Sequence, residues 1–287
     1  MGWSLQSIAS LTDSQFVQWS KLLEERTGIQ LADQHRAMLQ SQVSIRMREL
    51  GCTDYNQYFR AVTDGVQGRL EWTVLVDRLA VKETSFFRHR PSFELVRQYL
   101  ARRLAQGTVA DNLDLWSMGC ATGEEPYSLA MMADTCFEQA QAERYYGITA
   151  TDISMSALST GRRGCYSARK IESLSDAERE RYVHEVEPGV YQVDVSLRER
   201  ICFTHGNLMA IQTMPPVKQD VIFCQNLLIY FRRWLRRDIL NACVERLKPG
   251  GLLVVGLGEA PGWEHPKVRR VKAGQVQAYL RHDQQEQ

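Results

Sequence analysis

Residues 113–128 read LDLWSMGCATGEEPYS, and this stretch decides the fold class. Its first six residues form a short β-rich run, and a helical pattern begins at Glu124 after a loop bounded by Gly119 and Gly123. A strand, a glycine-containing loop and a helix in this order mark the place where doubly wound α/β sheets bind their ligands. We therefore expect an α/β sheet domain with a ligand at this loop.

The helix after the loop opens with Glu124, Glu125 and Pro126. Proline and acidic residues in the first turn suit the positive end of a helix dipole. A phosphate-binding loop leaves this end open for phosphate, whereas here carboxylates already occupy it. A cationic ligand is therefore favoured, and S-adenosylmethionine fits because it carries an α-amino group and a sulfonium but no phosphate. The alternative is a structural turn with ordinary capping acids.

Strands and helices alternate after residue 145, which is typical of a mainly parallel sheet covered by helices on both faces. Strands are expected at 145–151, 201–205, 221–224 and 252–256, and helices at 154–163 and 232–247. Residues 164–200 interrupt this alternation with a polar helical piece, a turn at Glu187-Pro188-Gly189 and an alternating run. We interpret this stretch as a small inserted subdomain with β character.

The first part of the chain has a helical pattern. Thr12 or Asp13 can cap a first helix that ends at Gly28, and apolar periodicity predicts three further helices before residue 80. We expect three parts: a helical domain at residues 1–82, a linker to about residue 92, and a sheet domain at 93–287 with an insertion at 164–200.

Composition narrows the class of protein. The 287 residues carry 35 Lys+Arg and 34 Asp+Glu, a net charge of +1 that argues against gripping nucleic acid by bulk electrostatics. No apolar run approaches the ~20 residues needed to cross a bilayer, and the start lacks a signal-peptide layout, so we expect a cytoplasmic protein without membrane insertion. The seven cysteines have no zinc-ligand spacing, and no metal is expected.

Polar residues follow several of the expected strands. Asp152 can accept both ribose hydroxyls of an adenosyl group, or it can cap the next helix. The first turn is not a full G-x-G-x-x-G, and the spacing to Asp152 exceeds the ~20 residues of a nicotinamide site, so a dehydrogenase is disfavoured. Asn226 can orient the amino-acid part of the cofactor or the nucleophile, and Tyr230 can approach the transferred methyl or simply pack.

The segment Thr84-Ser85-Phe86-Phe87-Arg88 lies between the two expected domains. Two adjacent aromatic residues usually belong to a core. The alternative is a lid over the cofactor that presents Arg88 to an anionic substrate. A separate group of four arginines at 232, 233, 236 and 237 surrounds Trp234, and it is more typical of a solvated or partner-docking face than of a nucleic-acid site.

Taken in order, these motifs closely resemble those of the chemotaxis receptor methyltransferases, the CheR family, which methylate receptor glutamates. The resemblance runs from about residue 12 to 282. Its most specific elements are the Phe-Phe-Arg and Gly-Glu-Glu-Pro-Tyr-Ser motifs, and it also includes Asp152-Ile153, Asn207-Leu208, Asn226-x-x-Ile229-Tyr230-Phe231 and Lys248-Pro249-Gly250-Gly251. It implies a Rossmann-like class I S-adenosylmethionine-dependent methyltransferase domain behind an all-α domain, and a protein-glutamate O-methyltransferase activity in chemosensory adaptation.

The resemblance also implies roles for individual residues. Arg88 and Tyr230 are expected nearest the reacting methyl. The implied cofactor contacts are Thr84, Arg88, Gly119, Glu125, Asp152, Asn207, Leu208, Asn226 and Leu227. Two positions depart from the family pattern, because Lys82 replaces a usual asparagine and Gln225 a common arginine.

The implied partner is the cytoplasmic coiled coil of a chemoreceptor, to which the protein is recruited in membrane arrays. Family members dock there with a basic second helix; here Arg36, Arg46 and Arg48 fall on that helix, although residues 1–70 carry seven basic and seven acidic residues. The short turn near Pro188 suggests an enzyme that needs no receptor pentapeptide, and we expect a monomer. The alternatives are a methyltransferase of another acceptor and a non-catalytic binding homologue.

Overall fold

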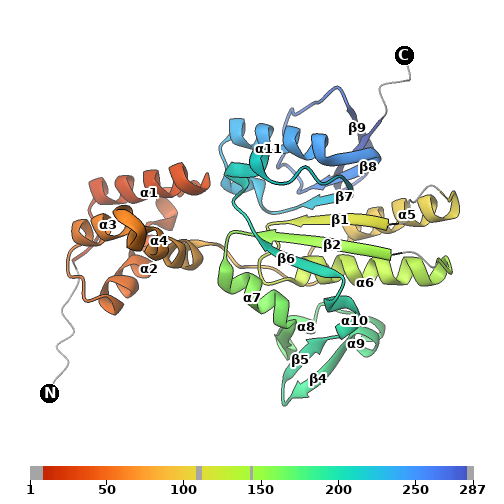
Figure 1. The fold of residues 1–287 in the computed structure, drawn as a ribbon, viewed down its shortest axis with the longest axis horizontal. Coiled ribbons are helices and arrows are strands. Elements are labelled where there is room, and N and C mark those ends of the chain that lie inside the picture. The colour runs from red at the N-terminus through yellow and green to blue at the C-terminus, as the bar shows by residue number, and fades with distance from the viewer. Residues whose placement is uncertain (1–8, 108–111, 143–144, 283–287) are drawn as a thin grey trace. The chain divides into compact units, whose positions relative to one another are not determined.

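The computed structural model describes residues 9–107, 112–142 and 145–282. These residues form two compact units, one helical and one built on a sheet (Figure 1). The helical unit comprises the described residues up to Val81 together with Tyr230–Arg232. The sheet unit comprises Lys82–Ile229 and the described residues from Arg233 onward.

The helical unit contains the four helices expected from sequence. Thr12 caps the first of them in a reciprocal capping box with Gln15, and Gly28 ends it with a left-handed backbone at φ 77°. A 3-10 turn, η1 (Asp33–His35), directly precedes the second helix. The helices are α1 (Asp13–Thr27), α2 (Arg36–Glu49), α3 (Tyr55–Thr63) and α4 (Gly65–Leu79).

An aromatic and ionic cluster holds these helices together. Trp19 of α1 stacks on Tyr58 of α3 with ring centroids 5.5 Å apart. The Tyr58 hydroxyl donates to Glu71 Oε1 over 2.6 Å, and burial together with this carboxylate raises the pKa of Tyr58 above its usual range. Arg46 donates two hydrogen bonds to the same carboxylate, at 2.7 and 2.6 Å. The half-buried Arg46 is thereby paired within the helical unit.

The sheet unit is built on seven strands in the order β6-β2-β1-β7-β8-β10-β9. Neighbours from β6 to β8 are parallel, as the sequence predicts. The hairpin of β9 and β10 was not predicted, and β10 runs antiparallel to both of its neighbours. The strands are β1 (Asn112–Met118), β2 (Tyr145–Asp152), β6 (Ile201–His205), β7 (Gln219–Cys224), β8 (Leu247–Val255), β9 (Val268–Ala273) and β10 (Val276–Arg281).

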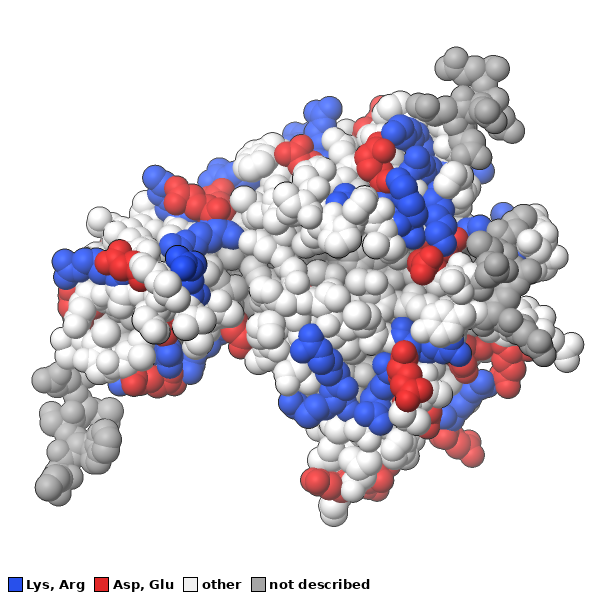
Figure 2. Space-filling model, in the orientation of Figure 1, with Lys and Arg blue, Asp and Glu red and all other residues white. Residues whose placement is uncertain are grey.

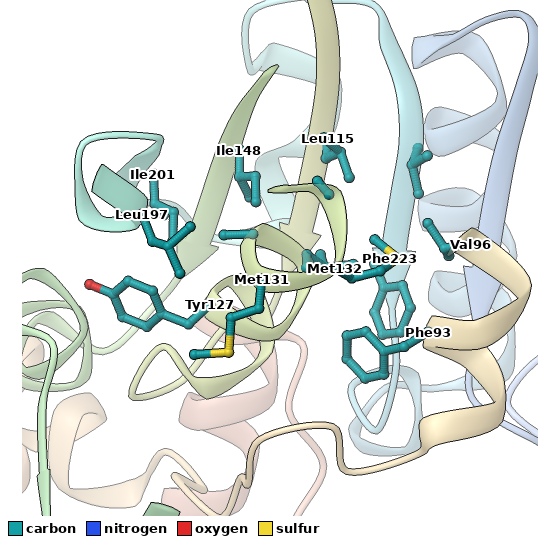
Figure 3. Packing of buried hydrophobic residues seen from close by; sticks show 14 of the residues in the cluster. Phe93, Val96, Leu115, Tyr127, Met131, Met132, Ile148, Leu197, Ile201 and Phe223 are labelled. Carbon is teal, nitrogen blue, oxygen red and sulfur yellow. The ribbon is translucent and has the colours of Figure 1, made fainter. Parts of the chain in front are cut away.

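Four longer helices accompany the sheet: α5 (Arg90–Ala105), α6 (Glu124–Gln139), α7 (Met155–Arg163) and α11 (Arg233–Arg246). The shorter helical elements include the 3-10 turns η2 (Leu208–Thr213) and η3 (Leu228–Tyr230). Helix α5 was not predicted. It starts immediately before Pro91, which the first turn of a helix tolerates, and it buries Phe93, Val96 and Leu100 at helical spacing. Figure 3 shows Phe93 beside Phe223 of β7, with ring centroids 4.9 Å apart, in the core between α5, α6 and the sheet.

Residues 164–200 form a subdomain with its own small antiparallel sheet, in the order β3-β5-β4. Its edge strand β4 contains a register shift between Glu185 and Glu187. The elements are β3 (Cys165–Ser167), α8 (Ala168–Ile171), α9 (Asp176–Tyr182), β4 (Val183–Glu187), β5 (Val190–Val193) and α10 (Val195–Arg198). Tyr182 ties the subdomain to the sheet unit, because its hydroxyl donates to Asp134 of α6 over 3.0 Å.

The surface carries charges of both signs, and two buried cysteines are protonated. Figure 2 shows Lys and Arg side chains intermixed with Asp and Glu over the visible face. Burial raises the pKa of Cys136 to about 11 and that of Cys243 to about 12, which keeps both thiols protonated. In the described ranges, no group of three or more His, Cys, Asp or Glu is placed to hold a metal, and no helix is long and apolar enough to cross a bilayer.

A buried carboxylate links the centre of the sheet to α5. Asp220 of β7 accepts hydrogen bonds from Arg103 of α5 at 2.9 Å, from Lys248 of β8 at 2.7 Å and from the backbone N–H of Asp114 in β1 at 2.9 Å. Its side chain is 1% exposed. One carboxylate therefore satisfies three donors on three different elements.

We expect Asp220→Ala to destabilise the sheet unit by about 3–5 kcal/mol, because it removes the buried carboxylate that pairs with Arg103 and Lys248 and leaves Lys248 with Asp114 alone. Hydrogen exchange of β1 and β7 amides in a urea series measures this loss. The matched control is Glu94→Ala, which removes an exposed pair with Arg97 and should cost less than about 1 kcal/mol. Equal losses in the two variants would contradict the structural role of Asp220.

Candidate functional site

The carboxyl ends of β1, β2, β6 and β7 meet at one edge of the sheet, because these neighbouring strands are parallel. This edge is where open α/β sheets bind ligands. The candidate residues at or within two residues of these strand ends are Gly119, Asp152, Asn207 and Asn226. Segments that are far apart in the sequence thus contribute to one site.

The loop after β1 needs glycine at its first position. Gly119 has φ 70°, and a Cβ there would lie 2.8 Å from Leu227 Cδ1. The backbone N–H groups of Gly119 and Cys120 both donate to the Thr151 carbonyl of β2. Ala121 then adopts φ 45°, an uncommon conformation for a residue with a side chain. The loop is therefore held by backbone hydrogen bonds to β2 and by the close approach of Leu227.

Glu124 does not face a ligand, although the sequence places it at the positive end of α6. Its side chain is fully buried, where it accepts hydrogen bonds from Lys170 of α8 at 2.7 Å and from Thr122 at 2.6 Å. Lys170 also donates to the Thr84 carbonyl over 2.9 Å. The inserted subdomain thereby connects the linker segment to the start of α6.

Glu125 is the carboxylate that remains at this end of α6. Protein atoms surround it closely although part of its surface is open, and this burial raises its pKa to about 8. A hydrogen bond from Ser117 Oγ, 2.7 Å from Glu125 Oε1, lowers the pKa, the negative charge of Glu259 raises it and the positive charge of Arg88 lowers it. A cation bound beside Glu125 would shift it to the ionised form.

Asp152 ends β2 and is held by backbone donors. Its Oδ2 accepts the N–H of Ala121 and its Oδ1 accepts the N–H of Ser154, each at 2.8 Å. Burial raises its pKa, whereas these backbone donors and the positive charge of Lys82 lower it. Lys82 donates to Ser156 Oγ over 2.7 Å. The lysine that replaces the usual asparagine thus provides electrostatic support to Asp152.

The loop after β7 is organised by Glu259, which sequence reasoning missed. Glu259 is 2% exposed and accepts the N–H groups of Gly256 at 2.9 Å, Asn226 at 3.1 Å and Ile229 at 3.3 Å. Asn226 has φ 57°. The only hint in the sequence is an acid shortly after an apolar strand that ends in glycine. Buried Gln225 donates to Ser92 Oγ over 2.7 Å.

The segment Thr84–Arg88 contains two buried phenylalanines and an exposed arginine. Its phenylalanines are core residues, because Phe86 packs edge-on against Tyr166 and Phe87 against Phe93. Phe87 adopts φ 48°, and its N–H donates to Ser128 Oγ over 2.9 Å. Arg88 is exposed and donates to the Glu83 carbonyl over 3.0 Å. The two aromatic side chains therefore anchor the segment rather than cover the site.

Three other expected residues are placed as follows. The Asn207 side chain accepts the N–H of Met209 over 3.0 Å and caps the turn η2. Leu208 is 7% exposed. Tyr230 groups with the helical unit, where its carbonyl accepts the N–H of Gln30 over 2.8 Å. The proximity of Tyr230 to the reacting methyl stays a prediction.

Comparison with known proteins assigns both parts of the chain. Residues 82–277 match the CheR methyltransferase SAM-binding domain, and residues 14–80 match the CheR methyltransferase all-alpha domain. The chain is 34% identical to the chemotaxis protein methyltransferase of Escherichia coli K12 over 93% of this chain and 91% of that relative. It is 33% identical to that of Salmonella typhimurium LT2 over 87% of this chain and 85% of the relative.

A likeness to a solved structure is more distant. The magnesium protoporphyrin IX methyltransferase of Synechocystis aligns with 84% of this chain and 97% of its own, at 13% identity and a TM-score of 0.39. At this low identity and TM-score, the similarity supports no conclusion beyond the family matches.

The sheet order, the glycine loop and the matched cofactor domain define an S-adenosylmethionine-dependent methyltransferase. The chain belongs to the CheR methyltransferase family, whose two domains it contains in the same order. The fold class and the cofactor predicted from sequence are thereby confirmed. The residues present fit the chemistry of the cofactor, because Glu125 is a carboxylate able to accept an ammonium group and Asp152 a carboxylate able to accept hydroxyl groups.

We expect Lys82→Met to raise the pKa of Asp152, because burial of the carboxyl would no longer be opposed by that positive charge. Carbon-detected NMR titration of the aspartate carboxyls measures the shift. Lys82→Arg keeps the charge and is the control. An unchanged pKa of Asp152 in Lys82→Met would remove Lys82 from this role.

Proposed function

We propose that this chain transfers the methyl group of S-adenosylmethionine to glutamate side chains of chemoreceptors. The products are glutamyl methyl esters and S-adenosylhomocysteine. Family membership and the names of the relatives support this proposal. The observation that carries it is the arrangement of Glu125, Asp152 and Asn226 at one edge of the sheet, with Arg88 close enough to lower the pKa of Glu125.

The cofactor would be held by groups that suit its two ends. Glu125 accepts its α-ammonium group, and Asp152 accepts the ribose hydroxyls with the lone pairs that its backbone donors leave. Asn226 orients the amino-acid part, and Gly119 lets the backbone approach it. The remaining proposed contacts are Thr84, Arg88, Asn207, Leu208 and Leu227.

The reaction asks little of acid–base catalysis. The cofactor supplies an electrophilic methyl on a sulfonium, and a glutamate with a reference pKa of ~4.3 is already an ionised nucleophile at neutral pH. The chain must therefore orient the carboxylate and exclude water from it. Arg88 and the Tyr230 hydroxyl would hold the carboxylate oxygens, since charge-assisted hydrogen bonds replace the lost hydration. Loss of one negative charge from the receptor helices would then shift their conformational balance.

We also propose that the receptor's coiled coil binds the helical unit and that this recruits the protein from the cytoplasm to receptor arrays. The three arginines on α2 differ in availability. Arg36 pairs with Asp13 and donates to the Leu11 carbonyl, and Arg46 pairs with Glu71. Arg48 makes no side-chain hydrogen bond or ion pair with the residues the structure describes. Docking by α2 alone would thus be weak.

The edge strand β4 supports a pentapeptide-independent enzyme. A receptor peptide could extend the small sheet only by pairing with an exposed edge. The register shift between Glu185 and Glu187 disturbs that edge, and the carboxylates along it discourage pairing. We therefore propose that receptors lacking a C-terminal pentapeptide are substrates, and that the protein acts as a monomer.

The decisive experiment incubates the protein with labelled S-adenosylmethionine and receptor cytoplasmic fragments. We expect base-labile label in the fragments, released as methanol. Label in a small metabolite instead would support another acceptor, and cofactor binding without any transfer would support a non-catalytic homologue. Titration calorimetry should show tighter binding of S-adenosylhomocysteine than of NAD, and the reverse order would defeat the methyltransferase assignment.

We expect Arg88→Ala to lower methyl transfer by a few orders of magnitude while cofactor binding stays measurable. Removal of a donor that stabilises a reacting group typically costs about 10²–10³ in kcat. Arg88→Lys, which keeps the charge but loses the planar fork, should recover part of the rate. Unchanged transfer in Arg88→Ala would exclude Arg88 from the mechanism.

Glu125 predicts a pH dependence of cofactor binding. Because its pKa is about 8 in the free protein, it is largely protonated at pH 7. Binding of an ammonium group favours the ionised form, so the affinity for S-adenosylhomocysteine should rise between pH 6 and 8, by at most about tenfold per pH unit, and then level off. Calorimetry in buffers of different ionisation enthalpy should detect the released proton.

The control for this pH dependence is Glu125→Gln, which should bind more weakly and without the rise. If the wild-type affinity is flat over the same pH range, Glu125 does not bind the ammonium group.

A further inference from the structure

Helix α11 and the loop at 259–264 enclose a hollow of about 240 Å³ in the sheet unit. Three arginines of α11 line it: Arg233, Arg236 and Arg237. The opposite wall is rigid, because Trp263 is 8% exposed and its indole N–H donates to Asn241 Oδ1 over 3.0 Å. The hollow therefore has a packed, hydrogen-bonded wall opposite its positive groups.

The positive charge of this hollow is poorly compensated. Arg233 and Arg237 form no hydrogen bond or ion pair with any residue that the structure describes. Of the two acids that line the hollow, Glu259 is already bound by three backbone N–H groups, and Glu264 is exposed at the rim. The first turn of α11 contains no acid, so the helix dipole adds to the same sign of charge. The hollow thus favours an anionic occupant.

The hollow adjoins the loop that carries the proposed cofactor contacts. Arg236 donates to the Ile229 carbonyl over 3.2 Å, and Ile229 follows Asn226 by three residues. Glu259 lines the hollow and binds the N–H groups of both Asn226 and Ile229. An occupant of the hollow would therefore lie next to the loop that carries Asn226.

Two of the three arginines of α2 are less available for an acidic partner. On α2, Arg36 and Arg46 are both paired within the helical unit, and residues 1–70 have a net charge of zero. Among the described residues, α2 therefore offers one arginine without a side-chain hydrogen bond or ion pair, Arg48, whereas α11 offers two, Arg233 and Arg237, that line one hollow.

We propose that this hollow docks acidic side chains that flank the target glutamate on the receptor's coiled coil. The inference rests on the proposed function and names a second docking surface for the same substrate. A protein segment fits better than nucleic acid for two reasons. The exposed apolar side chains of Ile229 and Trp234 lie beside the arginines in sequence, at 52% and 58% exposure. In addition, the net charge of +1 does not match the strongly basic charge that is typical of nucleic-acid-binding proteins.

The test is a steady-state comparison on the full chain with a receptor cytoplasmic fragment and saturating S-adenosylmethionine. In the variant Arg233→Glu with Arg237→Glu, the KM for the fragment should rise at least about fivefold, because charge reversal at a docking surface opposes encounter. The kcat and the KM for S-adenosylmethionine should stay unchanged. The matched control reverses two exposed basic residues of β9, Arg269→Glu with Lys272→Glu, and should leave the KM for the fragment unchanged.

A second arm neutralises the acids beside the methylated glutamate of the fragment. The difference between wild type and variant should then disappear, as in a double-mutant cycle. An unchanged KM in the α11 variant, or an equal rise in the β9 control, would overturn the inference. So would loss of polynucleotide binding with no change in the KM for the fragment. Absence of methylation by the wild type would instead contradict the proposed function itself.

Discussion

The site depends on hydrogen bonds between carboxylates and backbone N–H groups at the carboxyl edge of the sheet. Asp152 binds the N–H of Ala121, and Glu259 binds the N–H of Asn226. Each of the two loops that donate these N–H groups contains a non-glycine residue in the left-handed region, Ala121 at φ 45° and Asn226 at φ 57°. Such backbone conformations persist only where the surroundings impose them. A charge-assisted bond at each strained residue supplies that constraint, and both loops are thereby shaped before a ligand arrives.

Burial of carboxylates at this edge makes their ionisation less favourable. Burial raises the pKa of Asp152, Glu125 and Glu259 alike, so the sheet edge gathers acids that are each harder to ionise than in water. In Asp152 and Glu259 several backbone donors stabilise the ionised carboxylate, whereas the ionised form of Glu125 is stabilised by one hydroxyl donor, Ser117, and by the positive charge of Arg88. The least compensated acid is therefore the one best suited to receive a cation. Glu124, its neighbour in sequence, is excluded from this role because Lys170 already neutralises it.

The sequence was most informative where local pattern and geometry coincide. The order of strand, glycine loop and acidic helix start predicted the sheet domain, and apolar periodicity predicted the four helices of the first unit. Helix α5 was missed because a linker was expected to about residue 92, whereas Pro91 lies in the first turn of the helix, where proline is tolerated. Glu259 was missed for a different reason: its partners are backbone groups up to 33 residues away, and no side-chain motif records such contacts. The effect of Lys82 on Asp152 likewise depends on a fold that brings positions 82 and 152 together.

Lys170 has a consequence for how such proteins can be recombined. One ammonium group joins the Thr84 carbonyl to the buried carboxylate of Glu124, yet it belongs to the inserted subdomain. The insertion is therefore not an independent module attached to a finished domain. A chimera that exchanges the whole of residues 164–200 with another family member would also replace a structural ligand of the host's own loop. A graft boundary placed after α8 would retain that lysine, although the exchanged part would still include Tyr182, which bonds Asp134 of the host.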